Sequence, residues 1–278
     1  MREKGDFAKL KDIRLFLFDM DGTLYLGYDL FDFAKELLET IKNQGKKYLF
    51  MTNNSSKSVS AYVEKLAKLG IAADEDDFIT SSQATALYLN KNLKGKKLYV
   101  AGTRSFKDEL RASGVRVCED YADDIEGVVM GFDTELTFKK LDDVSKLLTL
   151  KKDLPFIAAN PDFVCPTEYG YVPDCGSVCG MIFNATGRKP FYIGKPRPEM
   201  PILAIEKMRK VDPKIDKDTT LVVGDRMYTD IACGINAKTK TMLVLSGETT
   251  EEQAFGGEYE MDYIARDAGR ILEILKQN

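Results

Sequence analysis

Two aspartates stand two residues apart at the end of a short apolar run near the N-terminus. Residues 15–18, Leu-Phe-Leu-Phe, lead into Asp19-Met20-Asp21-Gly22-Thr23. Alternate residues of a strand point the same way, so Asp19 and Asp21 share a face as long as the strand persists. A carboxylate pair at a strand end has the place and spacing of an acidic, metal-assisted active site. The alternative is an Asp-Gly turn that only ends a strand.

Three further polar clusters stand at comparable places. They are Thr52-Asn53-Asn54-Ser55-Ser56 after the run 48–51, Gly194-Lys195-Pro196 before a helix that opens near Pro198, and Gly224-Asp225-Arg226 with Asp230 after the run 221–223. Ligands of open parallel sheets bind beyond the carboxyl ends of the strands, so the strand-end clusters are predicted to meet at one rim. Each cluster alone has a plainer interpretation as a helix cap or a solvated loop lysine. Four coincidences in one chain favour a single site.

The elements that would position these residues form an α/β pattern, because short apolar runs alternate with amphipathic stretches. The first third predicts strands at 14–18, 47–51 and 78–80 and helices at about 33–44, 57–69 and 82–92. The middle predicts strands at 98–101, 127–130 and 155–159, helices at 104–113 and 137–150, and a long loop at 160–174. The last third predicts helices at 198–210, after Tyr228 and from Asp267, with strands at 221–223 and 242–245.

This order predicts a Rossmann-like parallel sheet core with helices on both faces and an inserted smaller α/β domain. The predicted domains are a first part of the core at 1–82, the insertion at 83–185 and the second part of the core at 186–278. Gly45 and Gly70 stand where left-handed helix caps are expected. Loops as long as 160–174 are usually functional in compact domains.

Composition narrows the function. The chain has 278 residues, 44% of them hydrophobic, and a net charge of −4 from 40 basic and 44 acidic residues without a long like-charged block. This balance predicts no nucleic-acid partner. The first apolar run is too short for a signal peptide or a membrane span, so we expect a cytoplasmic protein with no membrane partner.

The histidine and cysteine counts limit the chemistry further. The chain has no histidine, which excludes His-dependent triads and leaves carboxylates as the main catalytic groups. Its five cysteines have no disulfide-framework spacing. Cys165, Cys175 and Cys179 are close enough in sequence to suggest zinc, but without a fourth ligand they are better interpreted as small apolar residues.

The four clusters, taken in order, resemble the motifs of the haloacid dehalogenase-like (HAD) superfamily. Asp19 to Thr23, Thr52, Lys195, and Asp225 with Asp230 match its Asp-x-Asp-Gly-Thr, Thr or Ser, Lys, and Gly-Asp motifs, and the resemblance covers nearly the whole chain. Asn160-Pro161-Asp162, Pro166-Thr167, Gly176-Ser177, Thr186-Gly187-Arg188-Lys189-Pro190 and the Ile193-Gly194-Lys195-Pro196 segment resemble the NagD-like branch. That branch includes 4-nitrophenylphosphatases and carries a large α/β cap.

The resemblance implies a phosphatase for small soluble phosphomonoesters that works through an aspartyl phosphate. It implies Mg²⁺ bound by Asp19, Asp225 and the backbone carbonyl of Asp21, with Asp230 behind them. Asp19 would be the nucleophile and Asp21 the acid and base. Gly22, Thr52, Asn53 and Lys195 would bind phosphate. A free Asp with pKa about 3.9 is only ~0.1% protonated at pH 7, so the pKa of Asp21 must be raised.

The predicted cap would close over the site and recognise the leaving group. The tip of its long loop, Asp162, Phe163, Val164 and Cys165, is the candidate for substrate specificity; packing of the loop on its own domain is the alternative. A homodimer through the cap is a further implication of the resemblance. Two other functions stay open at this point: a phosphotransferase or phosphomutase using the same aspartyl phosphate, and a non-catalytic phosphate-binding protein.

Overall fold

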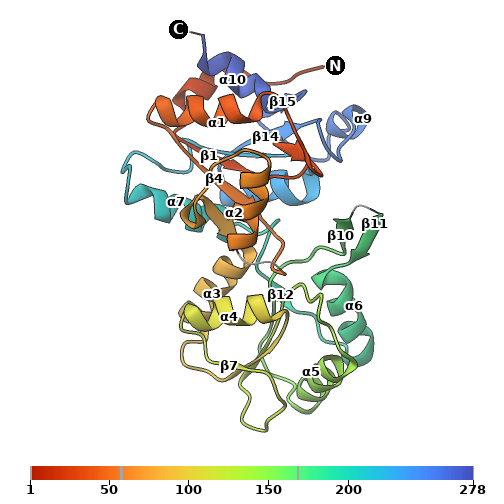
Figure 1. Cartoon of the computed structure of the whole chain (residues 1–278). Helices are drawn as coiled ribbons and strands as arrows, with labels where there is room; N and C mark the ends of the chain where they lie inside the picture. Colours follow the sequence, from red (N-terminus) through yellow and green to blue (C-terminus); the bar gives the residue numbers. More distant parts are fainter. Residues whose placement is uncertain (1, 57–58, 168, 278) are drawn as a thin grey trace. The chain divides into compact units, whose positions relative to one another are not determined.

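The computed structural model describes residues 2–56, 59–167 and 169–277. The chain divides into two compact units, each with its own parallel sheet (Figure 1). The first unit comprises Met1–Thr52, Val63–Ile79 and Lys195–Asn278, and the second comprises Asn53–Tyr62 and Thr80–Gly194. The predicted α/β class with a Rossmann-like core is confirmed.

The first unit is built on a six-stranded sheet of order β15-β14-β13-β1-β4-β5. Its elements are β1 (Leu15–Phe18), β2 (Tyr25–Leu26), β3 (Asp29–Leu30), α1 (Ala34–Asn43), β4 (Lys47–Thr52), α7 (Glu199–Arg209), β13 (Thr220–Gly224), α8 (Ala232–Ala237), β14 (Lys240–Val244), α9 (Glu251–Ala254), β15 (Tyr263–Ala265) and α10 (Gly269–Leu275). Two elements, α2 (Val59–Lys68) and β5 (Phe78–Thr80), cross between the units. Short helical turns lie at Phe7–Asp12, Glu75–Asp77 and Met227–Ile231.

Burial explains why the central strands sit where they do. All four residues of β1 are buried, because helices cover both faces of the sheet: α1 and α10 pack side by side on one, and α7 with α8 on the other (Figure 1). The helix α1 places Leu37, Leu38 and Ile41 on its buried side. The predicted left-handed conformations are confirmed at Gly45 (φ +72°) and Gly70 (φ +78°).

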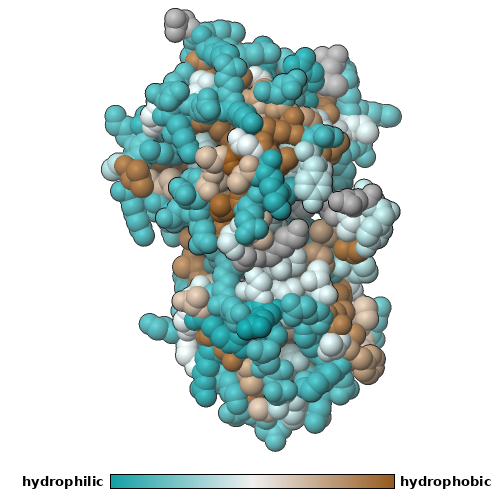
Figure 2. Space-filling model, in the orientation of Figure 1, coloured by the Kyte–Doolittle hydropathy of each residue, from teal (hydrophilic) through white to brown (hydrophobic). Residues whose placement is uncertain are grey.

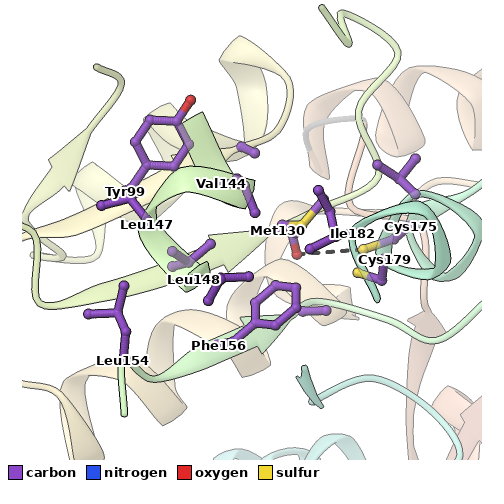
Figure 3. Close-up of a cluster of buried hydrophobic side chains, with 14 of the residues drawn as sticks. Tyr99, Met130, Val144, Leu147, Leu148, Leu154, Phe156, Cys175, Cys179 and Ile182 are labelled. Carbon is purple, nitrogen blue, oxygen red and sulfur yellow. Dashed lines mark hydrogen bonds between the residues drawn. The ribbon is translucent and has the colours of Figure 1, made fainter. Parts of the chain in front are cut away.

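The second unit has a five-stranded parallel sheet of order β12-β9-β8-β6-β7. Its elements are α3 (Ser81–Asn92), β6 (Leu98–Ala101), α4 (Arg104–Ala112), β7 (Val117–Cys118), β8 (Gly127–Met130), α5 (Phe138–Leu150), β9 (Phe156–Ala158), β10 (Val164–Thr167), β11 (Gly170–Pro173), α6 (Cys175–Thr186) and β12 (Phe191–Tyr192). Side chains of α5, α6 and the sheet form its core (Figure 3).

That core contains two of the three cysteines that stand close together in the sequence. Cys175 and Cys179 are buried among apolar side chains, and the Cys175 thiol donates to the Met130 carbonyl at 3.6 Å (Figure 3). A hydrogen bond with Cys179 and burial raise the pKa of the Cys175 thiol. A protonated, buried thiol behaves as a small apolar residue, as the sequence suggested.

Two sequence expectations need correction. The segment 160–174, expected to be a loop, contains the antiparallel pair β10–β11, in which Val164 faces Pro173 and Cys165 faces Val172. The prolines of this segment argue against strands in the sequence, because proline cannot donate a backbone hydrogen bond and is usually confined to edge strands. Residues 175–186 form α6, a helix that the sequence does not predict because its glycines and apolar residues show no helical periodicity. The start of the predicted helix at 57–69 lies outside the described residues, and α2 is described from Val59.

Figure 2 draws one face of the molecule, where hydrophilic residues cover most of the surface and hydrophobic ones lie in separate patches. In the part of the chain that the structure describes, no helix is both long and apolar enough to cross a membrane.

Candidate active site

The sheet of the first unit brings three of the four sequence clusters to one edge. Strand β1 lies between β13 and β4, with Phe18 opposite both Val223 and Phe50. The next residues along these parallel strands therefore emerge together at the carboxyl edge. Asp19 follows β1, Asp225 follows β13, and Thr52 ends β4. The Asp19 amide continues the ladder by donating to the Val223 carbonyl at 2.9 Å.

Lys195 completes this edge from far along the chain. Its Nζ donates to Asp19 Oδ1 at 2.7 Å and to Asp230 Oδ1 at 2.6 Å, and it also reaches the Met51 carbonyl at 3.3 Å. Its side chain is only 4% exposed. Burial alone would lower the pKa of Lys195, but the carboxylates of Asp19 and Asp230 outweigh burial and raise it. The ammonium is therefore charged at any physiological pH.

Asp230 lies beside the other two carboxylates of the site and not only behind them. It belongs to the π-helical turn Met227–Ile231, a form of helix that often marks functional sites. Asp19, Asp225 and Asp230 each offer an oxygen, and these oxygens lie within 4.8 Å of one another. Asp230 Oδ2 also accepts from the Arg226 amide at 3.2 Å. Its position serves both to hold Lys195 and to add charge beside the other two carboxylates.

Asp225 provides the observation that tests whether a metal ion fits. Its Oδ2 accepts from the Glu248 amide at 2.7 Å. Its Oδ1 is buried and, among the described residues, has no hydrogen-bond partner. A buried carboxylate oxygen without a donor is costly unless a cation completes it. The donor set of carboxylate oxygens suits Mg²⁺, so the residues fit this ion.

Two glycines make room beside Asp225. A Cβ on Gly247 would lie 2.0 Å from Asp225 Oδ2, and one on Gly22 would lie 2.5 Å from the same atom. Gly22 also has φ +82°, a conformation that other residues rarely adopt. The carboxylate of Asp225 is thus held where a larger residue at either position would displace it.

The crowding of acids shifts their pKa values. Burial, together with the charge of Asp19, raises the pKa of Asp225 to about 7. Burial raises the pKa of Asp230 to about 6, although Lys195 opposes this rise. Charges of one sign in a buried site disfavour ionisation, and a bound divalent cation reverses that preference. These raised values agree with a site built around a cation.

Asp21 lies at the more open side of this edge. Its side chain is 42% exposed, Oδ1 accepts from the Gly27 amide at 3.4 Å, and Oδ2 lies 3.9 Å from Lys65 Nζ. Burial raises the pKa of Asp21, while Lys65 opposes the rise. The direction is the one that a proton donor needs near neutral pH. Asp19 and Asp21 therefore have different surroundings, one beside a buried ammonium and the other at the rim.

The predicted phosphate-binding residues are divided between the two units. Thr52 is buried at the end of β4. The Gly22 amide donates to the Tyr25 carbonyl at 2.7 Å, so in this structure it is engaged within the first unit. Asn53 belongs to the second unit, where its carbonyl accepts from Ser81 and Asn160. Phosphate binding by these residues stays a prediction.

The predicted specificity residues lie in the second unit. Asp162 accepts from the Asn53 amide group at 3.1 Å through both carboxylate oxygens. The Asn54 side chain lies 3.7 Å from Cys165 Sγ. Phe163 is 70% exposed and Val164 49% exposed. Asp162 and Cys165 thus contact the segment that follows Thr52, and Phe163 presents an apolar surface.

Three residues of the site are not predicted by the sequence. Lys65 contacts Asp21, Glu248 contacts Asp225 through its amide, and Gly247 leaves the space beside that carboxylate. Arg226, which directly follows Asp225 in the motif, forms an ion pair with Glu248 at 2.7 Å. Lys65 lies within an ordinary amphipathic helix, and the 246–249 segment resembles any polar turn. No sequence signal distinguishes them.

Comparison with known proteins decides the family. The chain is 31% identical over 269 residues to an acid sugar phosphatase of Staphylococcus haemolyticus, an alignment that covers 97% of this chain and 99% of the relative. The chain belongs to the haloacid dehalogenase-like hydrolases. Family models agree: a haloacid dehalogenase-like hydrolase model matches residues 16–116, and a second model for HAD-like hydrolases matches residues 192–270.

Solved structures place this HAD-like hydrolase beside two named phosphatases. A 4-nitrophenylphosphatase from Thermotoga maritima has 37% identity and a TM-score of 0.86, covering 95% of this chain and 98% of that one. A glycerol phosphate phosphatase from Mycobacterium tuberculosis, solved with calcium, has 28% identity and a TM-score of 0.85, covering 94% and 75%. These relatives are phosphoric monoester hydrolases, and this HAD-like hydrolase is an enzyme of the same type.

Proposed function

We propose that the protein is a Mg²⁺-dependent phosphatase that hydrolyses a small phosphomonoester through an aspartyl phosphate on Asp19. The single observation that carries this proposal is the cluster of Asp19, Asp225 and Asp230, in which Asp19 and Asp230 pair with the buried ammonium of Lys195 and Asp225 Oδ1 lacks a donor among the described residues. A phosphomonoester dianion repels a carboxylate nucleophile by about 8 kcal/mol at ~4 Å if the effective dielectric is ~20. Positive charge at the nucleophile is therefore required.

Asp19, Asp225 and Asp230 are the side chains that would hold the ion, with the backbone carbonyl of Asp21 as the resemblance implies. When bound, Mg²⁺ supplies positive charge that offsets the repulsion between the nucleophile and the phosphate. A related glycerol phosphate phosphatase from Mycobacterium tuberculosis has been solved in complex with magnesium, which supports this choice of ion.

The residues of the chain divide the reaction between them. Lys195 orients Asp19 through its 2.7 Å hydrogen bond and adds positive charge where the phosphate must approach. An oxygen of Asp19 attacks phosphorus, the bond to the leaving oxygen breaks, and that oxygen takes a proton from Asp21. Asp21 then accepts a proton from water as the water oxygen attacks phosphorus, which frees Asp19 and inorganic phosphate.

The relatives support a substrate class for this site. Their names specify sugar phosphates, glycerol phosphate and 4-nitrophenyl phosphate, all small monoesters. We propose a small phosphorylated sugar or polyol, with the Phe163 and Val164 surface and its neighbours Asp162 and Cys165 contributing to the choice.

Phosphate release from 4-nitrophenyl phosphate, measured with and without Mg²⁺, tests the proposal. We expect release only with the metal ion and a loss of about a thousandfold or more in Asp19→Asn, because removal of a nucleophile removes the covalent step. Asp6→Asn, at an exposed N-terminal position, is the matched control and should keep full activity. Metal-independent release, or full activity of Asp19→Asn, would show the proposed mechanism to be wrong.

A further inference from the structure

Lys65 is a cation at the rim of the site to which no role has been given. It lies on α2, in the part of that helix that belongs to the first unit. Its Nζ lies 4.1 Å from the centre of the Tyr25 ring, 5.6 Å from that of Tyr28 and 3.9 Å from Asp21 Oδ2. The ammonium is thus bordered by two aromatic rings and one carboxylate, all of the same unit.

The two tyrosines belong to a small hairpin that immediately follows the first motif. Strands β2 and β3 pair with Tyr25 opposite Leu30 and enclose the two-residue turn Gly27-Tyr28. Gly27 has φ +62°, as the first position of such a turn often requires. An isolated bridge joins Asp21 to Tyr25, and the Gly27 amide reaches Asp21 Oδ1 at 3.4 Å. The carboxylate of Asp21 therefore contacts this hairpin through the Gly27 amide.

The contacts of Asp21 are individually weak. Its hydrogen bond to Gly27 is long, and 3.9 Å to Lys65 is near the limit of an ion pair. Its side chain is 42% exposed, and an exposed carboxylate with such contacts has several rotamers available. Lys65, by contrast, is only 25% exposed, and an ammonium over an aromatic face is held by the ring's quadrupole. The cation is better fixed than the carboxylate that faces it.

We propose that Lys65 is a positioning residue that directs the Asp21 carboxyl group toward the leaving oxygen. This inference rests on the proposed function, because it assigns Lys65 a role in the proton transfer that Asp21 performs. A carboxyl group that must reach one oxygen is sensitive to small displacements, and a misplacement of about 1 Å can cost about a hundredfold in rate. Lys65 faces one carboxylate oxygen of Asp21 and the Gly27 amide of the hairpin faces the other, so together they limit this displacement.

The alternative is that Lys65 only stabilises α2 against the hairpin. The two roles predict different dependence on the leaving group. A poor leaving group, such as the alkoxide of glycerol phosphate, needs the proton from Asp21, whereas 4-nitrophenolate leaves without it. A positioning role therefore predicts a large loss with the alkyl ester and a small loss with the aryl ester. A structural role predicts equal losses.

The experiment compares kcat/KM of Lys65→Met and wild type on glycerol phosphate, phenyl phosphate and 4-nitrophenyl phosphate with saturating Mg²⁺. We expect losses of about tenfold or more for glycerol phosphate and less than about twofold for 4-nitrophenyl phosphate, with phenyl phosphate between them. Lys65→Arg should recover most of the loss. Lys68→Met removes an exposed charge from the same helix and is the matched control, with no expected change.

A double-mutant cycle completes the test. In an Asp21→Asn background, Lys65→Met should cause no further loss with glycerol phosphate, because its effect passes through the missing carboxyl group. Urea unfolding checks that the variants are folded, and Lys65→Gln serves if the methionine variant is not. Equal losses on all three esters, or full additivity in the cycle, would overturn the role of Lys65 while leaving the phosphatase intact. A wild type that hydrolyses none of the esters would overturn the proposed function as well.

Discussion

Replacing Lys195 with methionine should destabilise the folded protein strongly, and the structure sets the magnitude. The ammonium lies 2.7 Å from Asp19 Oδ1 and 2.6 Å from Asp230 Oδ1. At an effective dielectric of about 20, each contact is worth about 6 kcal/mol. Oxygens of Asp19, Asp225 and Asp230 lie within 4.8 Å of one another, so each ionised pair costs about 3.5 kcal/mol or more at the same dielectric. The two attractions thus nearly balance the three repulsions.

Loss of the ammonium leaves those repulsions opposed mainly by the nearby guanidinium of Arg226. Proton uptake limits the loss, because burial already raises the pKa of Asp225 to about 7 and that of Asp230 to about 6. Breaking a buried ion pair from one side costs about 3–5 kcal/mol, and we expect a decrease of this size in the free energy of unfolding near pH 8 without metal ion. Added Mg²⁺ should recover part of it, because a ligand of the folded state stabilises that state.

Urea unfolding followed by circular dichroism measures this decrease, with Lys207→Met as the matched control. Lys207 pairs at 3.2 Å with Asp76, whose side chain is 97% exposed. Such a surface pair contributes about 0–1 kcal/mol, so its loss should barely move the midpoint. If the free energies of unfolding of Lys195→Met and Lys207→Met differ by less than about 1 kcal/mol, the buried carboxylates do not depend on Lys195 for their stability, and the predicted destabilisation is wrong.

Two further predictions concern the room beside Asp225 and a buried acid of the second unit. Gly247→Ala places a Cβ 2.0 Å from Asp225 Oδ2 and should weaken Mg²⁺ binding, measured by calorimetry, by about tenfold. Gly180→Ala is the control, because a Cβ there has nothing within 4 Å and should leave the affinity unchanged. Equal Mg²⁺ affinities of the two variants would contradict the prediction. Burial raises the pKa of Asp174 to about 7, above the value of about 3.9 in an unfolded chain, so its stabilising contribution is complete below about pH 4 and is lost as the pH rises through about 7. Between about pH 4 and pH 7, the free energy of unfolding of the wild type in urea should therefore fall, and Asp174→Asn should make this fall smaller by about 2–4 kcal/mol. An unchanged dependence of the unfolding free energy on pH would refute the raised pKa of Asp174.

The positions of Asp19 and Asp225 could be predicted from the sequence because their placement follows from local rules. Each directly follows a buried apolar run, and parallel strands align their carboxyl ends at one edge of a sheet. Lys195 required more, since no local pattern brings residue 195 to residue 19. The family resemblance implies its placement, and the structure puts the two side chains in contact.

The residues that were missed depend on packing that a linear pattern does not contain. Strands β10 (Val164–Thr167) and β11 (Gly170–Pro173) pair although each contains a proline. Helix α6 forms from an apolar, glycine-containing stretch because Asp174 caps its start and Gly187 ends it at φ +72°. Burial in the core of the second unit outweighed weak helix propensity there.

Lys65 shows the same limit at the site itself. On α2 it occupies an ordinary position of an amphipathic helix, and its sequence distance from Asp21 carries no information about contact. Only the fold brings its ammonium to 3.9 Å from the Asp21 carboxylate and over the ring of Tyr25. Motifs therefore locate groups whose chemistry needs a fixed residue type, whereas groups that orient them can come from any neighbouring surface. Among enzymes that share these motifs, we expect differences in how strongly the rate depends on the leaving group to arise from such neighbouring residues. In this chain, substitution of Lys65 measures that effect.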